Sequence, residues 1–282
     1  MDKAMANIQN QDHHRFAWND PAALNHFFEN GFIILKSAFP SGLIDKMYEF
    51  ISSRYSDLKN EAVNHHPNQA TPVVGICRKI MNELEASEFA SQLYHSENLL
   101  NCLENFLGPD LAKINANGLF VNDPSDDSPV TNKSFHQEIW TGASPDDMTV
   151  WIPFHTPEEA NTLAIVPGSH FYGILPNRNR QILPLENFSM PEPLPIVHVE
   201  PGDAVLFHSM LVHKTMGRGS KVRYAMHFVM RNTHAPLSEQ QRAFGFIGVR
   251  QGPMTKIRHV LGNDHFTPLR TYGGKISNHE DY

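Results

Sequence analysis

Helical patterning dominates the first 110 residues of the chain. The run PAALNHFFENGFIILKSAFP predicts a short helix, a break at Gly31 and a strand over residues 32–35. A second amphipathic helix is expected over 41–58, because its apolar residues recur at helical spacing. After a predicted loop in NEAVNHHPNQATP, helical spacing returns over 78–107, and Gly108 followed by proline ends it.

The pattern changes after residue 110. Short apolar or alternating runs such as MTVWIPFHT, TLAIVPG and RYAMHFVMRN are separated by turn clusters such as DPSDDSP, GASPDD and EPGD. A series of short strands with turn signals between them is typical of a β-sandwich or barrel. The sequence therefore predicts a mainly β fold with flanking helices.

The expected organisation is one domain that begins with a loose segment. Its parts are a flexible arm over 1–19, then a single domain over 20–282 with helices mostly in 20–110, a β core in 111–232 and a loop-rich segment, 233–282, with a helical stretch near 237–244. No internal repeat or low-complexity tract divides the chain.

Composition and charge narrow the class of protein. Hydrophobic residues make up 40% and charged residues 19%, as in an ordinary globular protein with a sizeable core. A net charge of -7 without a basic stripe argues against nucleic-acid and membrane partners. We expect no secretory leader, because polar residues dominate residues 1–16, and no run of about 18 apolar residues suggests a membrane span. Cys77 and Cys102 fit buried thiols, so we expect a cytoplasmic protein, and its oligomeric state is left open.

Candidate chemistry lies in a short polar run, His136-Gln137-Glu138. On an extended strand, residues two apart point to the same side, so His136 and Glu138 are expected to aim at one point. His213, 75 residues after Glu138, would add a third ligand. Two histidines and a carboxylate on one face of a metal leave three open positions, as in non-haem Fe(II) oxygenases. Arg223, ten residues after His213, would suit a dicarboxylate co-substrate.

Spacing alone does not select this pair among 17 histidines. The pattern His-x-Asp/Glu also occurs at His95/Glu97, His198/Glu200 and His279/Asp281. The first lies in helical spacing, where residues two apart diverge by roughly 200°. The second runs straight into a turn, and the third lies at the polar C-terminal end. His208 is expected to face the other side of the strand from His213, and His170 to brace a turn.

Taken together, these segments resemble the phytanoyl-CoA dioxygenase family of Fe(II)/2-oxoglutarate oxygenases over roughly residues 20–232. ENGFIILKSAF resembles the opening helix and strand of that family, and SFHQEI its first metal motif. MTVWIPFHTPEEANTLAIVPGSH resembles its central strand, acidic turn and PGSH segment. HVEPGDAVLFHSMLVHKTMGRGSKVRYAMHF resembles its GD turn, distal histidine and arginine. The resemblance implies a double-stranded β-helix, a jelly-roll or cupin-like barrel of two antiparallel sheets.

The resemblance also implies roles for single residues. The expected Fe(II) ligands are His136, Glu138 and His213. The expected contacts to 2-oxoglutarate and the pocket wall are Arg223, Thr215, Trp151 and Asn122, with Arg223 pairing with the distal carboxylate. The implied reaction consumes O2 and 2-oxoglutarate, releases succinate and CO2, and normally hydroxylates a small molecule.

Two residues depart from the family pattern. Glu138 stands where the family usually has aspartate, so either the strand sits further from the iron or the longer side chain folds back. Thr162 replaces a glycine that is common after Asn161. Because position 138 carries a carboxylate, a halogenase, which needs that coordination position for halide, is disfavoured.

Two other functions stay open. A zinc hydrolase could use the same three ligands, although the sequence has no HExxH motif and Arg223 would be unexplained. The other open function is that of a metal-binding β-barrel without oxygenase activity. The expected substrate is a small polar metabolite or biosynthetic intermediate, with 233–282 or the loop 54–78 closing over it. An acyl-CoA is less favoured, because Lys256 and Arg258 are the one suggestive cationic pair in the tail.

Overall fold

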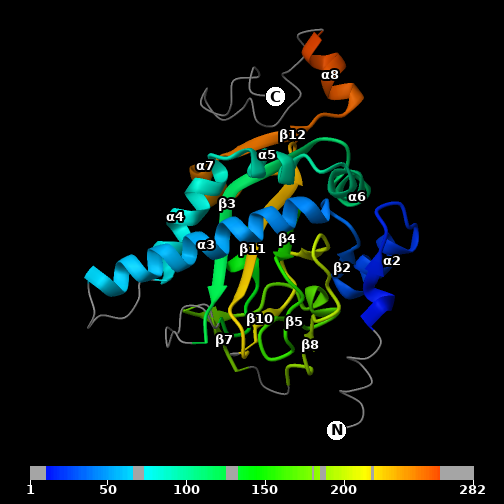
Figure 1. The fold of residues 1–282 in the computed structure, drawn as a ribbon. Helices are drawn as coiled ribbons and strands as arrows, with labels where there is room; N and C mark the ends of the chain where they lie inside the picture. Colours follow the sequence, from blue (N-terminus) through cyan, green and yellow to red (C-terminus); the bar gives the residue numbers. More distant parts are fainter. Residues whose placement is uncertain are drawn as a thin grey trace.

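A seven-stranded sheet forms the centre of the fold (Figure 1). The computed structural model describes residues 11–65, 73–124, 133–179, 181–184, 189–216 and 219–260. The large sheet has the order β1 (Arg15–Phe16), β2 (Phe32–Leu35), β9 (Ala204–His208), β4 (Asp147–Pro153), β11 (Arg223–Asn232), β3 (Leu111–Asn122) and β12 (Phe246–Arg250). A small sheet has the order β10 (His213–Thr215), β5 (Leu163–Ile165) and β8 (Leu194–Pro195), and β6 (Asn177–Arg178) pairs with β7 (Gln181–Ile182).

Alternation of side chains gives the large sheet two apolar faces. On β4, Val150 and Ile152 pack into the cluster beneath the helices, whereas Trp151 between them packs toward the small sheet. The cluster that contains Trp151 also contains Ile165 of β5 and Ala225 of β11. The small sheet therefore covers one face of the large sheet, and the helices cover the other.

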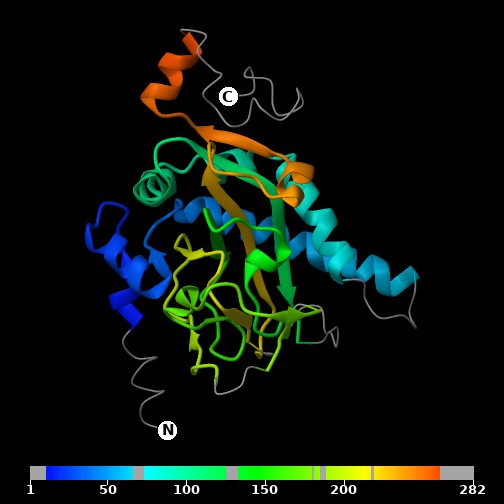
Figure 2. The same cartoon turned by 180° about the vertical axis from the view of Figure 1, so that it is seen from behind.

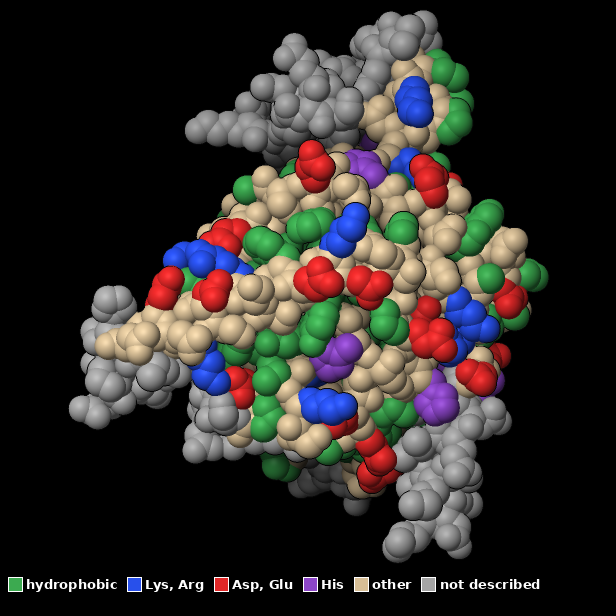
Figure 3. All heavy atoms as spheres, viewed as in Figure 1, with side chains coloured by type: hydrophobic (Ala, Val, Ile, Leu, Met, Phe, Trp, Pro, Cys, Tyr) green, Lys and Arg blue, Asp and Glu red, His purple; other side chains and the backbone are tan. Residues whose placement is uncertain are grey.

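The helical layer crosses the large sheet. Helix α3 runs in front of the sheet in Figure 1 and behind it in Figure 2. The helices are α2 (Ala22–Asn30), α3 (Ser41–His65), α4 (Val73–Glu85), α5 (Glu88–Tyr94) and α6 (Glu97–Leu107). Acidic and basic side chains are mixed over this face of the molecule (Figure 3). Across the described residues, every helix is too short or too polar to span a bilayer.

The helix boundaries differ from those that the sequence predicts. The expected loop after residue 58 is helical as far as His65. The prediction that residues 54–78 form a loop that closes over the substrate is therefore wrong for its helical part. Residues 66–72 lie outside the described ones. The helical region expected over 78–107 begins at Val73 and is divided into three helices. Ser87 starts the second of them by accepting a hydrogen bond from the Phe89 amide, as helix-capping serines do.

Both ends of the chain carry structure that we did not expect. Residues 11–16, predicted as part of a flexible arm, form the 3-10 helix η1 (Gln11–His14) and β1, which pairs in parallel with β2. Arg15 holds this segment in place through Asp203, at 2.7 Å between Nη2 and Oδ2. Helix α7 (Glu239–Phe244) confirms the predicted helical stretch, whereas β12 and α8 (Pro253–Val260) correct the expectation of a loop-rich segment. Residues 1–10 and 261–282 lie outside the described part.

The fold class is confirmed as β sheet with flanking helices. Among the described residues no pairing of strands closes the two sheets into a barrel, so the double-stranded β-helix stays a prediction. Cys77 and Cys102 are buried free thiols, as expected.

The turn before β9 requires a glycine. Gly202 has φ +99°, and a Cβ there would lie 2.8 Å from the carbonyl oxygen of Phe39. The next residue, Asp203, accepts hydrogen bonds from the amides of Ser37 and Glu200. The EPGD segment thus fixes the point at which β9 enters the large sheet.

We predict that Gly202→Ala lowers the free energy of unfolding by about 1–3 kcal/mol, because it adds backbone strain and a backbone clash. Urea denaturation measures the change. Gly42→Ala is the matched control: Gly42 lies in α3, with no heavy atom within 4 Å of an added Cβ, so the helix should be unaffected or slightly stabilised. Equal effects of the two substitutions would contradict this role for Gly202.

Candidate metal centre

The two histidines of the expected triad are cross-strand neighbours. His136 and His213 form an isolated antiparallel bridge. The amide of His136 donates to the His213 carbonyl at 2.9 Å, and the amide of His213 donates to the His136 carbonyl at 3.1 Å. Their ring centroids are 4.1 Å apart. Backbone pairing therefore fixes two imidazoles side by side.

Glu138 reaches the same point from a 3-10 helix rather than from a strand. The expectation of a continuous strand is wrong here, because the chain turns after Gln137 into η3 (Glu138–Thr141). Glu138 Oε1 nevertheless lies 3.5 Å from His136 Nε2 and 3.3 Å from His213 Nε2. Within the described residues, this is the one group whose ligand atoms meet the spacing for a metal ion, all within 4.8 Å of one another.

Gln137 holds this turn in position. We did not single it out from the sequence, where its place between two expected ligands was its one distinguishing feature. Its side chain is fully buried. Its Nε2 donates to the carbonyls of Gly173 and Met210, and its Oε1 accepts from the Leu175 amide. The Ile139 amide also donates to the Ser209 carbonyl. These bonds tie the start of η3 to the segment that leads into His213.

The hydrogen bonds of both imidazoles point their free nitrogens at Glu138. His136 Nδ1 lies 2.8 Å from the Ser134 carbonyl, and His213 Nδ1 lies 2.9 Å from the Leu211 carbonyl. Because a carbonyl only accepts, each Nδ1 carries the hydrogen, and in the neutral ring each Nε2 presents a lone pair. With both rings neutral, three electron-pair donors therefore converge on one point. A divalent cation fits this donor set, and the carbonyls provide the supporting bonds that metal-binding histidines have.

The protonation states also suit a metal. Burial raises the pKa of the Glu138 carboxyl, but the two adjacent imidazoles outweigh it and hold that pKa well below its usual range. Burial, and then the neighbouring His136, lower the pKa of His213. The site therefore offers a carboxylate and a neutral imidazole at neutral pH, the forms that bind divalent metals.

Arg223 is a buried cation without a counter-charge in the described part of the chain. It is 4% exposed, its Nε has no hydrogen-bond partner, and it forms no ion pair with a described residue. Burial lowers the pKa of Arg223 to about 10, so the side chain stays charged at neutral pH. Ala225, two residues along β11, packs between the sheets, so Arg223 faces the small sheet that carries His213. A buried charge of this kind calls for an anion.

The other expected contacts lie around this space. Asn122 pairs in register with Arg223 and donates to Asn161 Oδ1 at 2.8 Å. Thr215 lies two residues after His213 on β10, hence on the same side. Trp151 is buried in the apolar cluster between the sheets. Co-substrate roles for Asn122, Thr215 and Trp151 stay predictions.

His227 is a further residue of this space, which we did not identify from the sequence. It lies four residues after Arg223 on the same face of β11, and its ring centroid is 4.9 Å from that of Phe120. Burial lowers the pKa of His227 to about 4, and the charges of Glu138 and the two triad histidines also act on it. A neutral imidazole therefore lies close to the triad. Its spacing of four residues from Arg223 on one strand was the one feature of the sequence that could have indicated this position.

The competing His-x-acid pairs are used elsewhere. Glu97 pairs with Arg250 at 2.5 Å, and Glu200 pairs with Arg15 at 3.2 Å. His279 and Asp281 lie outside the described residues. As expected, His170 braces its turn, because its Nε2 donates to the Phe28 carbonyl at 2.9 Å. Thr162 fills the position of the family glycine, and its hydroxyl donates to the Ile196 carbonyl.

Comparison with known proteins identifies the family of the chain. The sequence profile of the family described as phytanoyl-CoA dioxygenase (PhyH) matches residues 27–225, more than half of the chain. No curated protein matches the sequence.

Three solved structures illustrate the likeness in fold. The non-heme monooxygenase ThoJ, in its apo form, is 17% identical, with a TM-score of 0.59 over 81% of this chain and 83% of that one. The epimerase SnoN in complex with Fe3+, alpha ketoglutarate and nogalamycin RO is 15% identical, with a TM-score of 0.57 over 84% and 92%. CytC3 with Fe(II) and alpha-ketoglutarate is 15% identical, with a TM-score of 0.54 over 83% and 89%. At these identities the likeness shows the fold alone.

We predict that His213→Ala weakens Co(II) binding at least about 100-fold. Removing a residue that only supports a metal ligand lowers metal affinity about 10–100-fold, and removing a ligand itself should cost more. Glu138→Asp should weaken it about tenfold or more, since a side chain one methylene shorter, starting from η3, falls short of both imidazoles. Visible absorbance of bound Co(II) measures both affinities. His95→Ala, at the exposed end of α5, is the control. Unchanged Co(II) affinity in His213→Ala would show that the metal binds elsewhere.

Proposed function

The chain belongs to the phytanoyl-CoA dioxygenase family, and on that premise we propose that it is a non-haem Fe(II)/2-oxoglutarate-dependent oxygenase. The proposed reaction oxidises a small molecule, most often by hydroxylation, with O2 as co-substrate and succinate and CO2 as products. The observation that carries the proposal is the combination of the His136/Glu138/His213 group with the buried Arg223, which has no ion-pair partner among the described residues. We also infer that the two sheets correspond to the double-stranded β-helix of the family.

The triad residues would hold the metal through His136 Nε2, Glu138 Oε1 and His213 Nε2. When bound, Fe(II) supplies the oxidative chemistry with O2 and 2-oxoglutarate. The chain's part is to fix the orientation of both imidazoles through the carbonyls of Ser134 and Leu211. Gln137 keeps the carboxylate-bearing turn in place.

Arg223 would bind the distal carboxylate of 2-oxoglutarate. The guanidinium is planar and offers paired N–H donors, which match a carboxylate better than an ammonium does. Its burial strengthens the pairing, because less water competes for the charge. A dicarboxylate is therefore the co-substrate that this cation favours.

The substrate would lie against the inner face of β11 and β3. His227 and Phe120 face this space beside the triad. The neutral imidazole of His227 makes no hydrogen bond with a described residue, so it is available to orient a hydroxyl or carbonyl group. This wall suits a small, partly polar metabolite or biosynthetic intermediate. ThoJ is named a monooxygenase and SnoN an epimerase, so proteins with this fold are named for more than one reaction.

The two alternatives account for less of the structure. A zinc hydrolase would use the three ligands but would leave Arg223 as a buried charge without a purpose. A metal-binding barrel without activity would explain neither the buried Arg223 nor the imidazole of His227, which makes no hydrogen bond with a described residue. Both predict different behaviour toward 2-oxoglutarate.

The deciding experiment adds Fe(II) and then 2-oxoglutarate to metal-free protein without oxygen. A weak visible charge-transfer band should appear as the keto acid chelates the metal. Arg223→Ala should raise the Kd for 2-oxoglutarate about 30-fold or more, as expected when one partner of a buried charge pair is removed. Arg54→Ala is the control, because Arg54 pairs with Glu83 on the helical surface, far in sequence from the site.

Three outcomes separate the candidate functions. No band with native protein would exclude the proposal and leave the zinc hydrolase. A band that forms without consumption of 2-oxoglutarate, when oxygen is admitted with candidate substrates, would indicate a binding barrel. An unchanged Kd in Arg223→Ala would remove Arg223 from the co-substrate site.

A further inference from the structure

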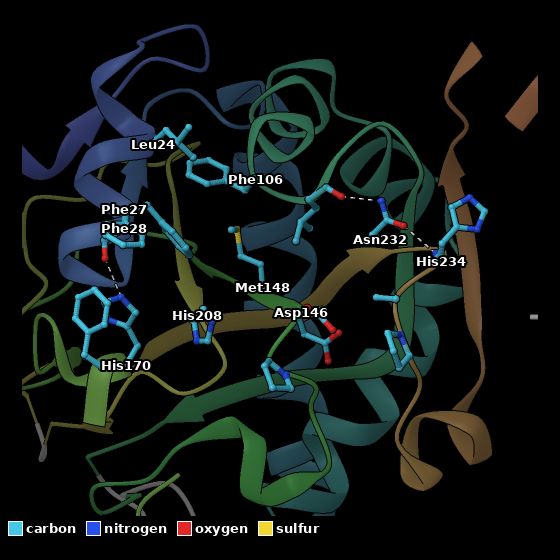
Figure 4. A pocket seen from close by; sticks show the side chains of 16 residues that line it. Leu24, Phe27, Phe28, Phe106, Asp146, Met148, His170, His208, Asn232 and His234 are labelled. Atoms are coloured by element: carbon cyan, nitrogen blue, oxygen red, sulfur yellow. Dashed lines mark hydrogen bonds between the residues drawn. The ribbon is translucent and has the colours of Figure 1, made fainter. Parts of the chain in front are cut away.

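A cavity of about 620 Å³ lies against the helix-covered face of the large sheet, opposite the face that carries Arg223 and His227. Figure 4 shows the side chains that line it. Met148 of β4 and His208 of β9 line it and are direct cross-strand partners. Met148 belongs to the apolar cluster beneath the helices, as do Ala204 and Leu206 of β9. His208 lies two residues after Leu206, so it faces the same side of the sheet. No residue of the metal triad lines this cavity.

The apolar wall of the cavity is made of aromatic rings from three elements. Phe27 of α2 contacts Phe106 of α6 at a centroid distance of 4.9 Å. Phe28 contacts Phe171 of the 3-10 helix η4 (Ser169–Tyr172) at 5.6 Å. Phe28 is 67% and Phe171 61% exposed. Exposed rings gathered around a hollow are typical of a surface that binds something, because a monomer rarely leaves such a patch uncovered.

Most polar groups of the cavity already have partners. Asn232 donates to the Leu107 carbonyl and accepts from the His234 amide, and both bonds are drawn in Figure 4. His170 donates to the Phe28 carbonyl. Asn232 therefore has little capacity left for a ligand, whereas His170 Nδ1 is buried without a hydrogen-bond partner among the described residues.

Two further polar groups are available, on His208 and Asp146. His208 Nδ1 accepts a hydrogen bond from the Met210 amide at 3.1 Å, so in the neutral ring the hydrogen is on Nε2. That Nε2 makes no hydrogen bond within the described residues. Burial lowers the pKa of His208 to about 4, which keeps the ring neutral. The exposed carboxylate of Asp146 bonds the Ser144 hydroxyl through Oδ2 at 3.3 Å and keeps further acceptor capacity.

The charge of the cavity restricts its ligand. Its described lining includes Asp146 and Asp147 but no lysine or arginine. An anion such as 2-oxoglutarate would therefore meet a carboxylate and no cation. The volume of about 620 Å³ lies within the range of small-molecule sites, about 300–1,000 Å³.

We propose that this cavity is a second binding site, which takes a neutral or cationic small molecule with a ring-bearing apolar body and one hydroxyl or amino group. The rings would stack among the phenylalanines, His208 Nε2 would donate to an oxygen of the ligand, and Asp146 would accept from its hydroxyl or amino group. The site does not depend on Fe(II) or 2-oxoglutarate. It therefore stands or falls separately from the proposed oxygenase function.

A matched pair of fluorescent probes tests the proposal on metal-free, full-length protein. N-phenyl-1-naphthylamine is neutral, and 8-anilinonaphthalene-1-sulfonate has the same rings with one added negative charge. We expect the neutral probe to bind with a stoichiometry of one and the sulfonate at least about tenfold more weakly, because Asp146 repels it. Asp146→Lys should remove most of that difference. His213→Ala should leave binding of the neutral probe unchanged.

Blocking variants locate the bound probe. Ala235 is a half-buried residue of the lining, and Ala235→Trp should fill the cavity and abolish the fluorescence increase. If that variant does not fold, as judged by circular dichroism, Phe28→Ser combined with Phe171→Ser changes exposed residues only and should weaken binding about fivefold or more. Phe244→Ala is the control, since Phe244 is 46% exposed on α7 and does not line the cavity.

Three results would overturn the proposal. Binding of the neutral probe that survives the blocking variants would place the probe elsewhere. Equal affinities of the two probes for native protein would show apolar adhesion without charge selection. A dimer in analytical ultracentrifugation that Phe28→Ser with Phe171→Ser dissociates would show that this face is covered by a second copy of the chain.

Discussion

The pair of backbone hydrogen bonds between His136 and His213 is the constraint on which the metal centre depends. These bonds join two residues that are far apart in the chain and place their imidazoles 4.1 Å apart. One of the two residues begins β10 of the small sheet, so the centre is anchored to the core between the sheets. Gln137 then fixes the turn that brings Glu138 to the same point. Main-chain hydrogen bonds between paired segments therefore set the geometry of the metal site. Paired segments position side chains more precisely than loops do.

Charges held away from water are the second physical constraint on the site. Arg223 stays charged at 4% exposure without a described partner, which is costly for the free protein. Glu138 likewise stays ionised in a half-buried position, facing two imidazoles. Both costs fall when opposite charge arrives, in the form of a cation for Glu138 and of an anion for Arg223. A ligand-binding role explains why the fold keeps these two charges apart instead of pairing them with each other.

The sequence predicted the convergence of the triad better than its local structure. His136-Gln137-Glu138 alternates like a strand, but the hydrogen bonds of Gln137 and of the Ile139 amide turn the chain into a 3-10 helix. Those bonds reach partners 36 and 73 residues away, so local periodicity carries no sign of them. The two-residue strand β1 was missed because so short a run has no measurable alternation. Family resemblance singled out Arg223, whereas His227 and the cavity beneath the helices became visible only in the folded chain.

The most direct test of the central claim is a crystal structure of the protein grown with Fe(II) and 2-oxoglutarate without oxygen, using anomalous scattering at the iron absorption edge. The account predicts one strong anomalous peak within coordination distance, about 2.0–2.2 Å, of His136 Nε2, Glu138 and His213 Nε2. It also predicts density for the keto acid, with the distal carboxylate on the Arg223 guanidinium. An iron peak away from the three residues, or a keto acid whose distal carboxylate does not meet Arg223, would contradict it.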